Sequence, residues 1–153
     1  SGPITLKWAV ANLLPHSGSM ILIGEPAKSD DQWAEAAVRI GEDSLYYKSG
    51  LGVPSWVGAE YMAQTIALFA GVEARQAGDD IQIGLLIGCR RYEVETEYFR
   101  LGSQLRIHVS EIWTDNEMAV FDCSIEDRKI LAKAHLNVFR PGDSAAFLEG
   151  GRS

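Results

Sequence analysis

A long apolar segment without proline limits which folds this chain can adopt. At 1.5 Å per residue, a helix from Ser55 to Ala77 would be about 34 Å long. Apolar side chains would cover nearly every face of it, namely Trp56, Val57, Ala59, Tyr61, Met62, Ala63, Ile66, Ala67, Leu68, Phe69, Ala70 and Val72. A helix that is apolar all round is surrounded by other protein. We therefore expect a buried central helix with an N-cap at Ser55 and a stop at Gly78.

The segments around this helix have the patterns of a short helix and of β-strands. An amphipathic helix is expected at 4–14, and an irregular loop, rich in glycine and tyrosine, at 45–54. Strands with period-two alternation or short apolar runs are expected at 20–23, 33–40, 81–87, 90–96, 104–113, 118–125 and 130–139. Turn-rich joints connect the later strands. This order predicts an α+β fold in which a curved antiparallel sheet wraps around one long central helix.

The length of 153 residues corresponds to one domain. We expect a single domain over residues 4–140, followed by a loose tail at 141–153 in which glycine, serine and aspartate accumulate. The central helix has more apolar surface than a five- or six-stranded sheet comfortably covers. A homodimer, or a heterodimer with a related chain, is therefore expected.

Charge and cysteine content exclude several kinds of partner. Fourteen Lys and Arg are outnumbered by twenty-one Asp and Glu, and this net charge of -7 offers no basic surface to nucleic acid or an anionic membrane. No apolar run reaches the roughly 18 residues of a membrane span, and the first residues lack the layout of a signal peptide. The two cysteines lack metal-binding spacing. We expect a cytoplasmic protein without a metal site.

Two polar residues interrupt the apolar helix. Glu60 and Gln64 are four positions apart and therefore lie on one face. A buried carboxylate is costly unless it is paired, hydrogen-bonded or protonated, and desolvation turns a carboxyl group into a useful general acid. Such an acid could protonate a leaving hydroxyl group. The alternative is a structural Glu60, held by a backbone amide or by an arginine such as Arg90.

Further candidates lie at the helix start and before the first strand. The N–H group of Ser55 would suit a carbonyl oxygen that gains negative charge, although capping the helix is the simpler role. His16 follows Leu14-Pro15 and precedes a polar turn, where it could enter a cleft or act as a structural cap. His108 and His135 lie in alternating strands, so we expect them to be solvated or to make ordinary hydrogen bonds.

The segments that contain these candidates resemble one protein family. LPHSGSMILI at 14–23 is similar to the LPHRxPxLLVD opening of hotdog-fold beta-hydroxyacyl-acyl-carrier-protein dehydratases, and VPSWVGAEYMAQ at 53–64 resembles their xPGxxxxExMAQ helix entry. The remainder, including GLLIG at 84–88, is most similar to the ApeP-like branch associated with aryl-polyene biosynthesis. The resemblance covers most of residues 6–140.

This resemblance implies a hotdog fold with a thioester site at a dimer interface, where an acyl chain on phosphopantetheine loses water across its α and β carbons. It assigns the hydroxyl to Glu60 and the carbonyl-binding amide to Ser55, where the family usually has glycine. The family's catalytic histidine, fourteen positions before the glutamate, falls on Tyr46. A phenol is a poor base at neutral pH. The base is then His16 or a group of a partner subunit, or the chain has kept the fold without the activity.

The favoured interpretation is a dehydratase of 3-hydroxyacyl thioesters in fatty-acid or polyene biosynthesis. Glu60 would protonate the departing hydroxyl, His16 would be the base, Ser55 would bind the thioester oxygen, Gln64 would orient Glu60, and Tyr46 would contact substrate. The substrate would arrive on an acyl carrier protein or coenzyme A, without a further cofactor. The alternatives are a hotdog acyl thioesterase, in which Glu60 activates water, and a non-catalytic partner subunit of a dehydratase.

Overall fold

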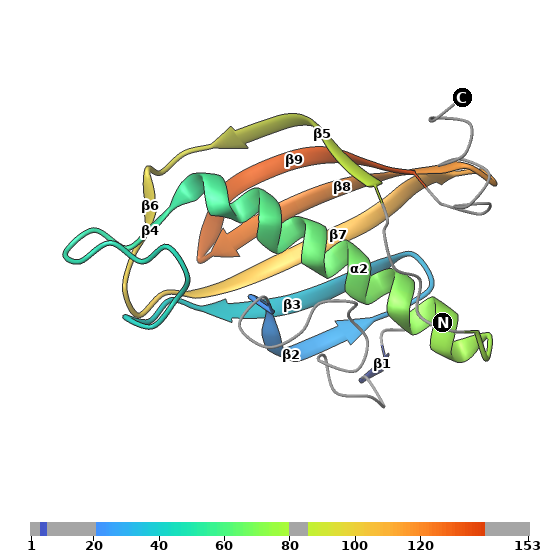
Figure 1. Ribbon diagram of the computed structural model, residues 1–153, viewed down its shortest axis with the longest axis horizontal. Coiled ribbons are helices and arrows are strands. Elements are labelled where there is room, and N and C mark those ends of the chain that lie inside the picture. The colour runs from blue at the N-terminus through green and yellow to red at the C-terminus, as the bar shows by residue number, and fades with distance from the viewer. Residues whose placement is uncertain (1–3, 6–20, 80–85, 140–153) are drawn as a thin grey trace, which may run out of the picture.

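An antiparallel sheet curves around one long helix in the computed structural model, which describes residues 4–5, 21–79 and 86–139 (Figure 1). The main sheet has seven strands in the order β1-β2-β3-β7-β8-β9-β5, and β4 and β6 form a separate pair. The elements are β1 (Ile4–Thr5), β2 (Gly24–Ser29), β3 (Trp33–Arg39), β4 (Val53–Pro54), the 3-10 turn η2 (Ser55–Val57), α2 (Gly58–Gln76), β5 (Leu86–Val94), β6 (Tyr98–Phe99), β7 (Gln104–Thr114), β8 (Met118–Asp127) and β9 (Lys129–Phe139). The predicted fold class is confirmed.

The hydrophobic core lies between α2 and the concave face of the sheet. Met62, Ile66 and Phe69 of the helix are at most 2% exposed, and Phe69 meets Phe121 of β8 edge-on with ring centroids 5.5 Å apart. The sheet contributes alternate residues from the first half of β7 and from β8, namely Leu105, Ile107, Val109, Ala119, Phe121, Cys123 and Ile125. Within the described ranges, no helix has the length and apolarity that a membrane crossing requires.

The first strands differ from the sequence prediction. Residues 21–23 form no strand, and β2 begins only at Gly24, in a segment with the composition of a turn. Pro26 is tolerated there because β2 lies near the edge of the sheet and its register with β3 shifts along the strand. Residues 4–5 form β1 rather than the start of a helix. The rest of that predicted helix lies outside the described residues.

The later strands follow the predicted pattern closely. β7, β8 and β9 form an antiparallel meander through direct neighbours, as the turn-rich joints between them indicate. β5 covers most of the segment predicted at 90–96 and returns to pair with β9 at the end of the sheet. Most of the predicted strand at 81–87, and the tail at 141–153, lie outside the described residues.

The start of the helix differs from the predicted N-cap. Ser55 is the first residue of η2, and neither η2 nor α2 has a side-chain hydrogen bond at its N-cap position. The main chain of Ser55 is held instead by distant residues: its N–H donates to the carbonyl of Glu97 at 2.9 Å, and its carbonyl accepts from the hydroxyl of Tyr92 at 2.5 Å. Tertiary contacts therefore replace the local cap.

The two cysteines differ in accessibility, which predicts a simple labelling result. Cys123 is buried in the core, where burial raises the pKa of its thiol, whereas Cys89 is exposed on β5. The thiolate is the reactive form. We expect a thiol reagent to modify Cys89 in the native protein and Cys123 only after denaturation, as read by mass spectrometry of labelled peptides. Equal rates at both positions in the native protein would contradict the described core.

Candidate active site

Helix α2 brings Gln64 and Glu60 into contact one turn apart. Gln64 is 1% exposed, and its Oε1 accepts a 2.8 Å hydrogen bond from the main-chain N–H of Leu22. Its Nε2 donates to Oε1 of Glu60 at 3.5 Å. The chain before β2 thus fixes which way the amide of Gln64 faces, and the amide turns its donor toward the carboxylate. This geometry suits the orienting role predicted for Gln64.

Glu60 itself is exposed, so the prediction of a buried carboxylate is wrong for the single chain. The helix is not covered on every face, because a strip bordering Glu60, made of Ala59, Ala63 and Ala70, is only half-buried. Among the described residues, no ion pair reaches Glu60 from Arg90 or from any other cation. The single chain therefore provides neither the desolvation that a general acid needs nor the structural salt bridge that was the alternative.

The main-chain N–H of Ser55 already has an acceptor. Its 2.9 Å hydrogen bond to the carbonyl of Glu97 occupies the donor that was expected to bind a thioester oxygen. A single N–H aligned with one carbonyl does not serve a second acceptor well. The predicted role of this amide is therefore wrong for the described conformation. The next N–H groups of the turn belong to Trp56 and Val57.

Two exposed aromatic rings lie beside the helix start. Tyr46 is 52% exposed and Trp56 is 60% exposed, and their ring centroids are 5.0 Å apart. Tyr46 has a φ of 67°, which is uncommon for a residue with a side chain. Trp56 precedes Glu60 by one helical turn, but apolar periodicity assigned it to the buried helix. Nothing in the sequence pattern separates this exposed tryptophan from its buried neighbours.

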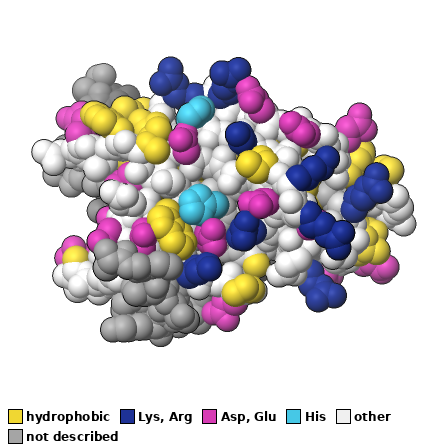
Figure 2. Space-filling model, turned by 180° about the vertical axis from the view of Figure 1, so that it is seen from behind, with side chains coloured by type: hydrophobic (Ala, Val, Ile, Leu, Met, Phe, Trp, Pro, Cys, Tyr) yellow, Lys and Arg dark blue, Asp and Glu magenta, His cyan; other side chains and the backbone are white. Residues whose placement is uncertain are grey.

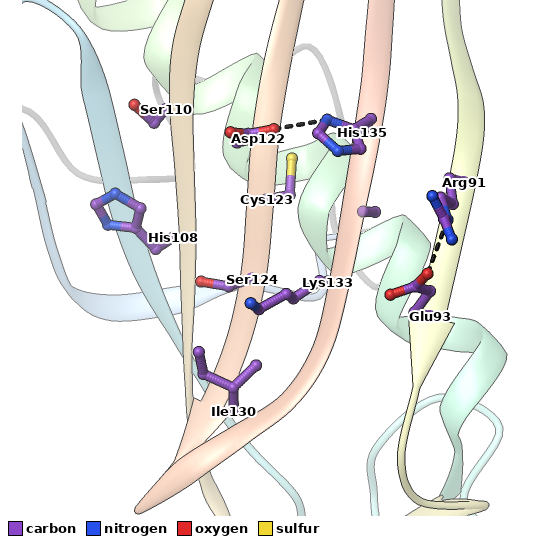
Figure 3. Close-up of a pocket in the computed structure, with 11 residues that line it drawn as sticks. Arg91, Glu93, His108, Ser110, Asp122, Cys123, Ser124, Ile130, Lys133 and His135 are labelled. Atoms are coloured by element: carbon purple, nitrogen blue, oxygen red, sulfur yellow. Dashed lines mark ion pairs between the residues drawn. The ribbon is translucent and has the colours of Figure 1, made fainter.

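Histidine side chains lie on the convex face of the sheet, away from α2 (Figure 2), and the sheet's described histidines are His108 of β7 and His135 of β9. Together with residues of β5 and β8 they line a cavity of about 410 Å³ (Figure 3). Nδ1 of His108 lies 2.9 Å from a carboxylate oxygen of Glu35, and Nδ1 of His135 lies 2.6 Å from one of Asp122. Both histidines thus make ordinary surface hydrogen bonds, as expected. Of the predicted site residues that the structure describes, namely Tyr46, Ser55, Glu60 and Gln64, none lines this cavity.

Two further predictions are a base at His16 and the absence of a metal site. His16 lies outside the described residues, so its role as a base stays a prediction. Over residues 21–79 and 86–139, no three side chains of His, Cys, Asp or Glu come together in a way that could hold a metal ion.

Replacing Gln64 by leucine should reduce the free energy of unfolding. Leucine retains much of the volume but removes the acceptor for the Leu22 N–H and the donor to Glu60. Leaving a buried donor without its partner costs about 1 to 3 kcal/mol. Chemical denaturation measures this loss, and a variant as stable as the wild type would contradict the described contact.

The folded shape defines the class of protein as a hotdog fold. The chain is similar to "The Dehydratase Heterocomplex ApeI:P from Xenorhabdus doucetiae", with a TM-score of 0.83 and 21% identity over 94% of this chain and 97% of that chain. It is also similar to the PaaI protein from the phenylacetic acid degradation operon of E. coli (TM-score 0.54, 12% identity, 77% and 81% covered). A hypothetical thioesterase with coenzyme A from Streptococcus pneumoniae gives the same score (0.54, 12% identity, 76% and 82% covered).

The sequence then places the chain within that class. A family model described as ApeP-like, ApeP dehydratase, matches residues 8–149. The chain belongs to the ApeP-like dehydratase family, which confirms the resemblance to that branch predicted from the sequence. No curated protein sequence matches it significantly.

Proposed function

We propose that this chain takes part in the dehydration of 3-hydroxyacyl thioesters, as a dehydratase subunit that works with a second hotdog chain. The observation that carries this proposal is the Glu60–Gln64 contact at the start of the central helix, in a chain of a dehydratase family. Loss of water requires an acid for the leaving hydroxyl. Glu60 supports that role because its carboxyl group faces away from the core, where a substrate can reach it.

In the proposed reaction, a base removes a proton from the α carbon of the thioester. The electron pair of that bond forms the α,β double bond, and Glu60 gives its proton to the β-hydroxyl, which leaves as water. His16 is the proposed base, and Tyr46 contacts the substrate. Because the N–H of Ser55 is engaged, we assign the negative charge on the thioester oxygen to the N–H groups of Trp56 and Val57.

A partner chain would supply the enclosure that the single chain lacks. Among the described strands, β5 has β9 as its one neighbour, so its other edge is unpaired. An unpaired edge is a template for a strand of another chain. Because Tyr92 of β5 contacts Ser55, this edge adjoins the helix start. A second copy, or a related hotdog chain as in the heterocomplex named above, would thus cover Glu60 by binding here.

The substrate would be carried on the phosphopantetheine of an acyl carrier protein or of coenzyme A. Membership in the ApeP-like family supports aryl-polyene biosynthesis as the pathway. The proposed location is the cytoplasm. No cofactor of the enzyme's own is needed, because acid, base and amide groups suffice for the elimination.

One assay separates dehydration from hydrolysis, the reaction supported by the thioesterase among the similar structures. The purified protein is given a 3-hydroxyacyl thioester, and the products are followed for a conjugated enoyl chromophore and for free thiol. Enoyl product without thiol supports dehydration, whereas free thiol without enoyl product contradicts it and supports a thioesterase.

The position of Tyr46 favours one further candidate, a non-catalytic partner subunit. This chain has a phenol where the family's histidine would stand, and the ring is exposed. If the protein is inert alone but is required for turnover by a homologue that has the histidine, it is a companion subunit. Turnover by the protein alone would exclude that candidate.

A further inference from the structure

The first turn of the central helix is held by the segment that runs from β5 to β6. Ser55 donates its N–H to the carbonyl of Glu97 at 2.9 Å and accepts the hydroxyl of Tyr92 at 2.5 Å. The two residues before Ser55 pair as β4 with Phe99 and Tyr98 of β6. Both main-chain polar groups of Ser55 thus bond to residues about forty positions away, and its carbonyl also accepts the N–H of Gly58 within the turn. This turn carries Trp56 and leads to Glu60.

The hydroxyl of Tyr92 occupies a space that exists because residue 58 is glycine. A Cβ atom at Gly58 would overlap this hydroxyl and would lie 2.7 Å from Cδ1 of Ile125. Burial raises the pKa of the Tyr92 phenol, so the group stays protonated and remains a hydrogen-bond donor at any physiological pH. Tyr92 is partly buried, and its hydroxyl has the Ser55 carbonyl as its polar partner.

We infer that Tyr92 is a positioning residue, which through the Ser55 carbonyl sets the orientation of the turn from Ser55 to Gly58 and hence of the groups that contact the thioester. This inference rests on the proposed function. Tyr92 does not touch the reacting atoms; it acts on the N–H groups of Trp56 and Val57 and on the ring of Trp56. Groups aimed at charge that develops in the transition state lose much of their effect when they are misplaced by about 1 Å.

Tyr92→Phe removes this one oxygen and tests the inference. We expect kcat for dehydration of a 3-hydroxyacyl thioester to fall about 10- to 100-fold, with KM changed by no more than about twofold. We expect Tm to change by only a few degrees. Amide hydrogen exchange of residues 53–60 should become faster. Tyr98→Phe, which removes a hydroxyl from the adjoining strand β6, is the matched control and should leave kcat and exchange unchanged.

Gly58→Ala perturbs the same hydrogen bond between Tyr92 and Ser55 by adding a methyl group beside the Tyr92 hydroxyl. The added methyl group should displace the Tyr92 hydroxyl and lower kcat. In the double variant Gly58→Ala/Tyr92→Phe, the shortest overlap of the methyl group is removed and the contact with Ile125 remains, so the double variant should lose less activity than the product of the two single losses. Independent effects of the two substitutions would overturn the inference.

The two readouts separate this inference from the proposed function. Faster exchange in Tyr92→Phe with unchanged kcat would make Tyr92 merely structural and would overturn the inference. Unchanged exchange would overturn it as well. The exchange comparison needs no turnover, so it decides whether Tyr92 fixes this turn even if the wild-type protein dehydrates no substrate. A lack of dehydration would contradict the proposed function but would leave the exchange result intact.

Discussion

Glu60→Gln should lower the rate of dehydration by about 10²- to 10⁴-fold, the range over which a positioned acid accelerates such reactions. Glutamine has the shape of glutamate and keeps an oxygen that accepts from Nε2 of Gln64, so the side chain retains its place. It has no acidic proton to give to the leaving hydroxyl. Because Glu60 is exposed, the free energy of unfolding should change by no more than about 0.5 kcal/mol.

Glu73→Gln is the matched control for this variant. Glu73 is another exposed glutamate of α2, more than three turns further along the helix. Its replacement makes the same change of charge and should leave turnover unchanged. A Glu60→Gln protein with wild-type turnover would refute the acid role, and equal losses in both variants would reduce the effect to net charge.

Gly52→Ala should destabilise the protein by about 2 to 5 kcal/mol, because two separate costs add. Gly52 has a φ of 115°, a conformation that residues with a side chain rarely adopt. Its Cβ would also overlap the carbonyl oxygen of Phe99 and lie 3.2 Å from Cα of Arg100, which are backbone atoms at the end of β6 and directly after it. Gly52 is followed by β4 and then by η2, so activity should fall together with stability.

Gly50→Ala separates these two costs. Gly50 also has a positive φ, 79°, but a Cβ there would meet no atom within 4 Å. This variant therefore bears only the conformational cost, about 1 to 2 kcal/mol. Chemical denaturation of both variants gives the comparison. Equal losses would show that the close approach of Gly52 to Phe99 is not rigid.

The sequence predicts the fold well where one side chain in two is buried. Leu105, Ile107 and Val109 alternate along β7 and all point to the core, as their spacing requires. Periodicity fails at the edge, where β2 contains Pro26 and an irregular register instead of an apolar run. It also cannot show that a helix with apolar residues all round has an incompletely covered strip, because Ala63 and Ala70 read as core residues.

The site is harder to predict because it depends on contacts between distant parts of the chain. The Glu60–Gln64 pair follows from helical spacing and is found as expected. The hydrogen bonds from Ser55 to Glu97 and from Tyr92 to Ser55 cannot be predicted from a local sequence pattern. They occupy the N–H of Ser55 that was expected to bind the thioester oxygen. In the proposed assembly the exposure of Glu60 would likewise depend on the partner chain, which local patterns in one sequence do not describe.

The position of Glu60 in the assembled protein tests the proposed mechanism most directly. A crystal structure with a bound, non-reactive 3-hydroxyacyl thioester analogue measures the distance from the Glu60 carboxyl oxygens to the β-hydroxyl. We predict a distance of about 2.6 to 3.2 Å, with a partner chain excluding water from the carboxyl group. Glu60 in open solvent, or a β-hydroxyl that contacts a different acid, would contradict it.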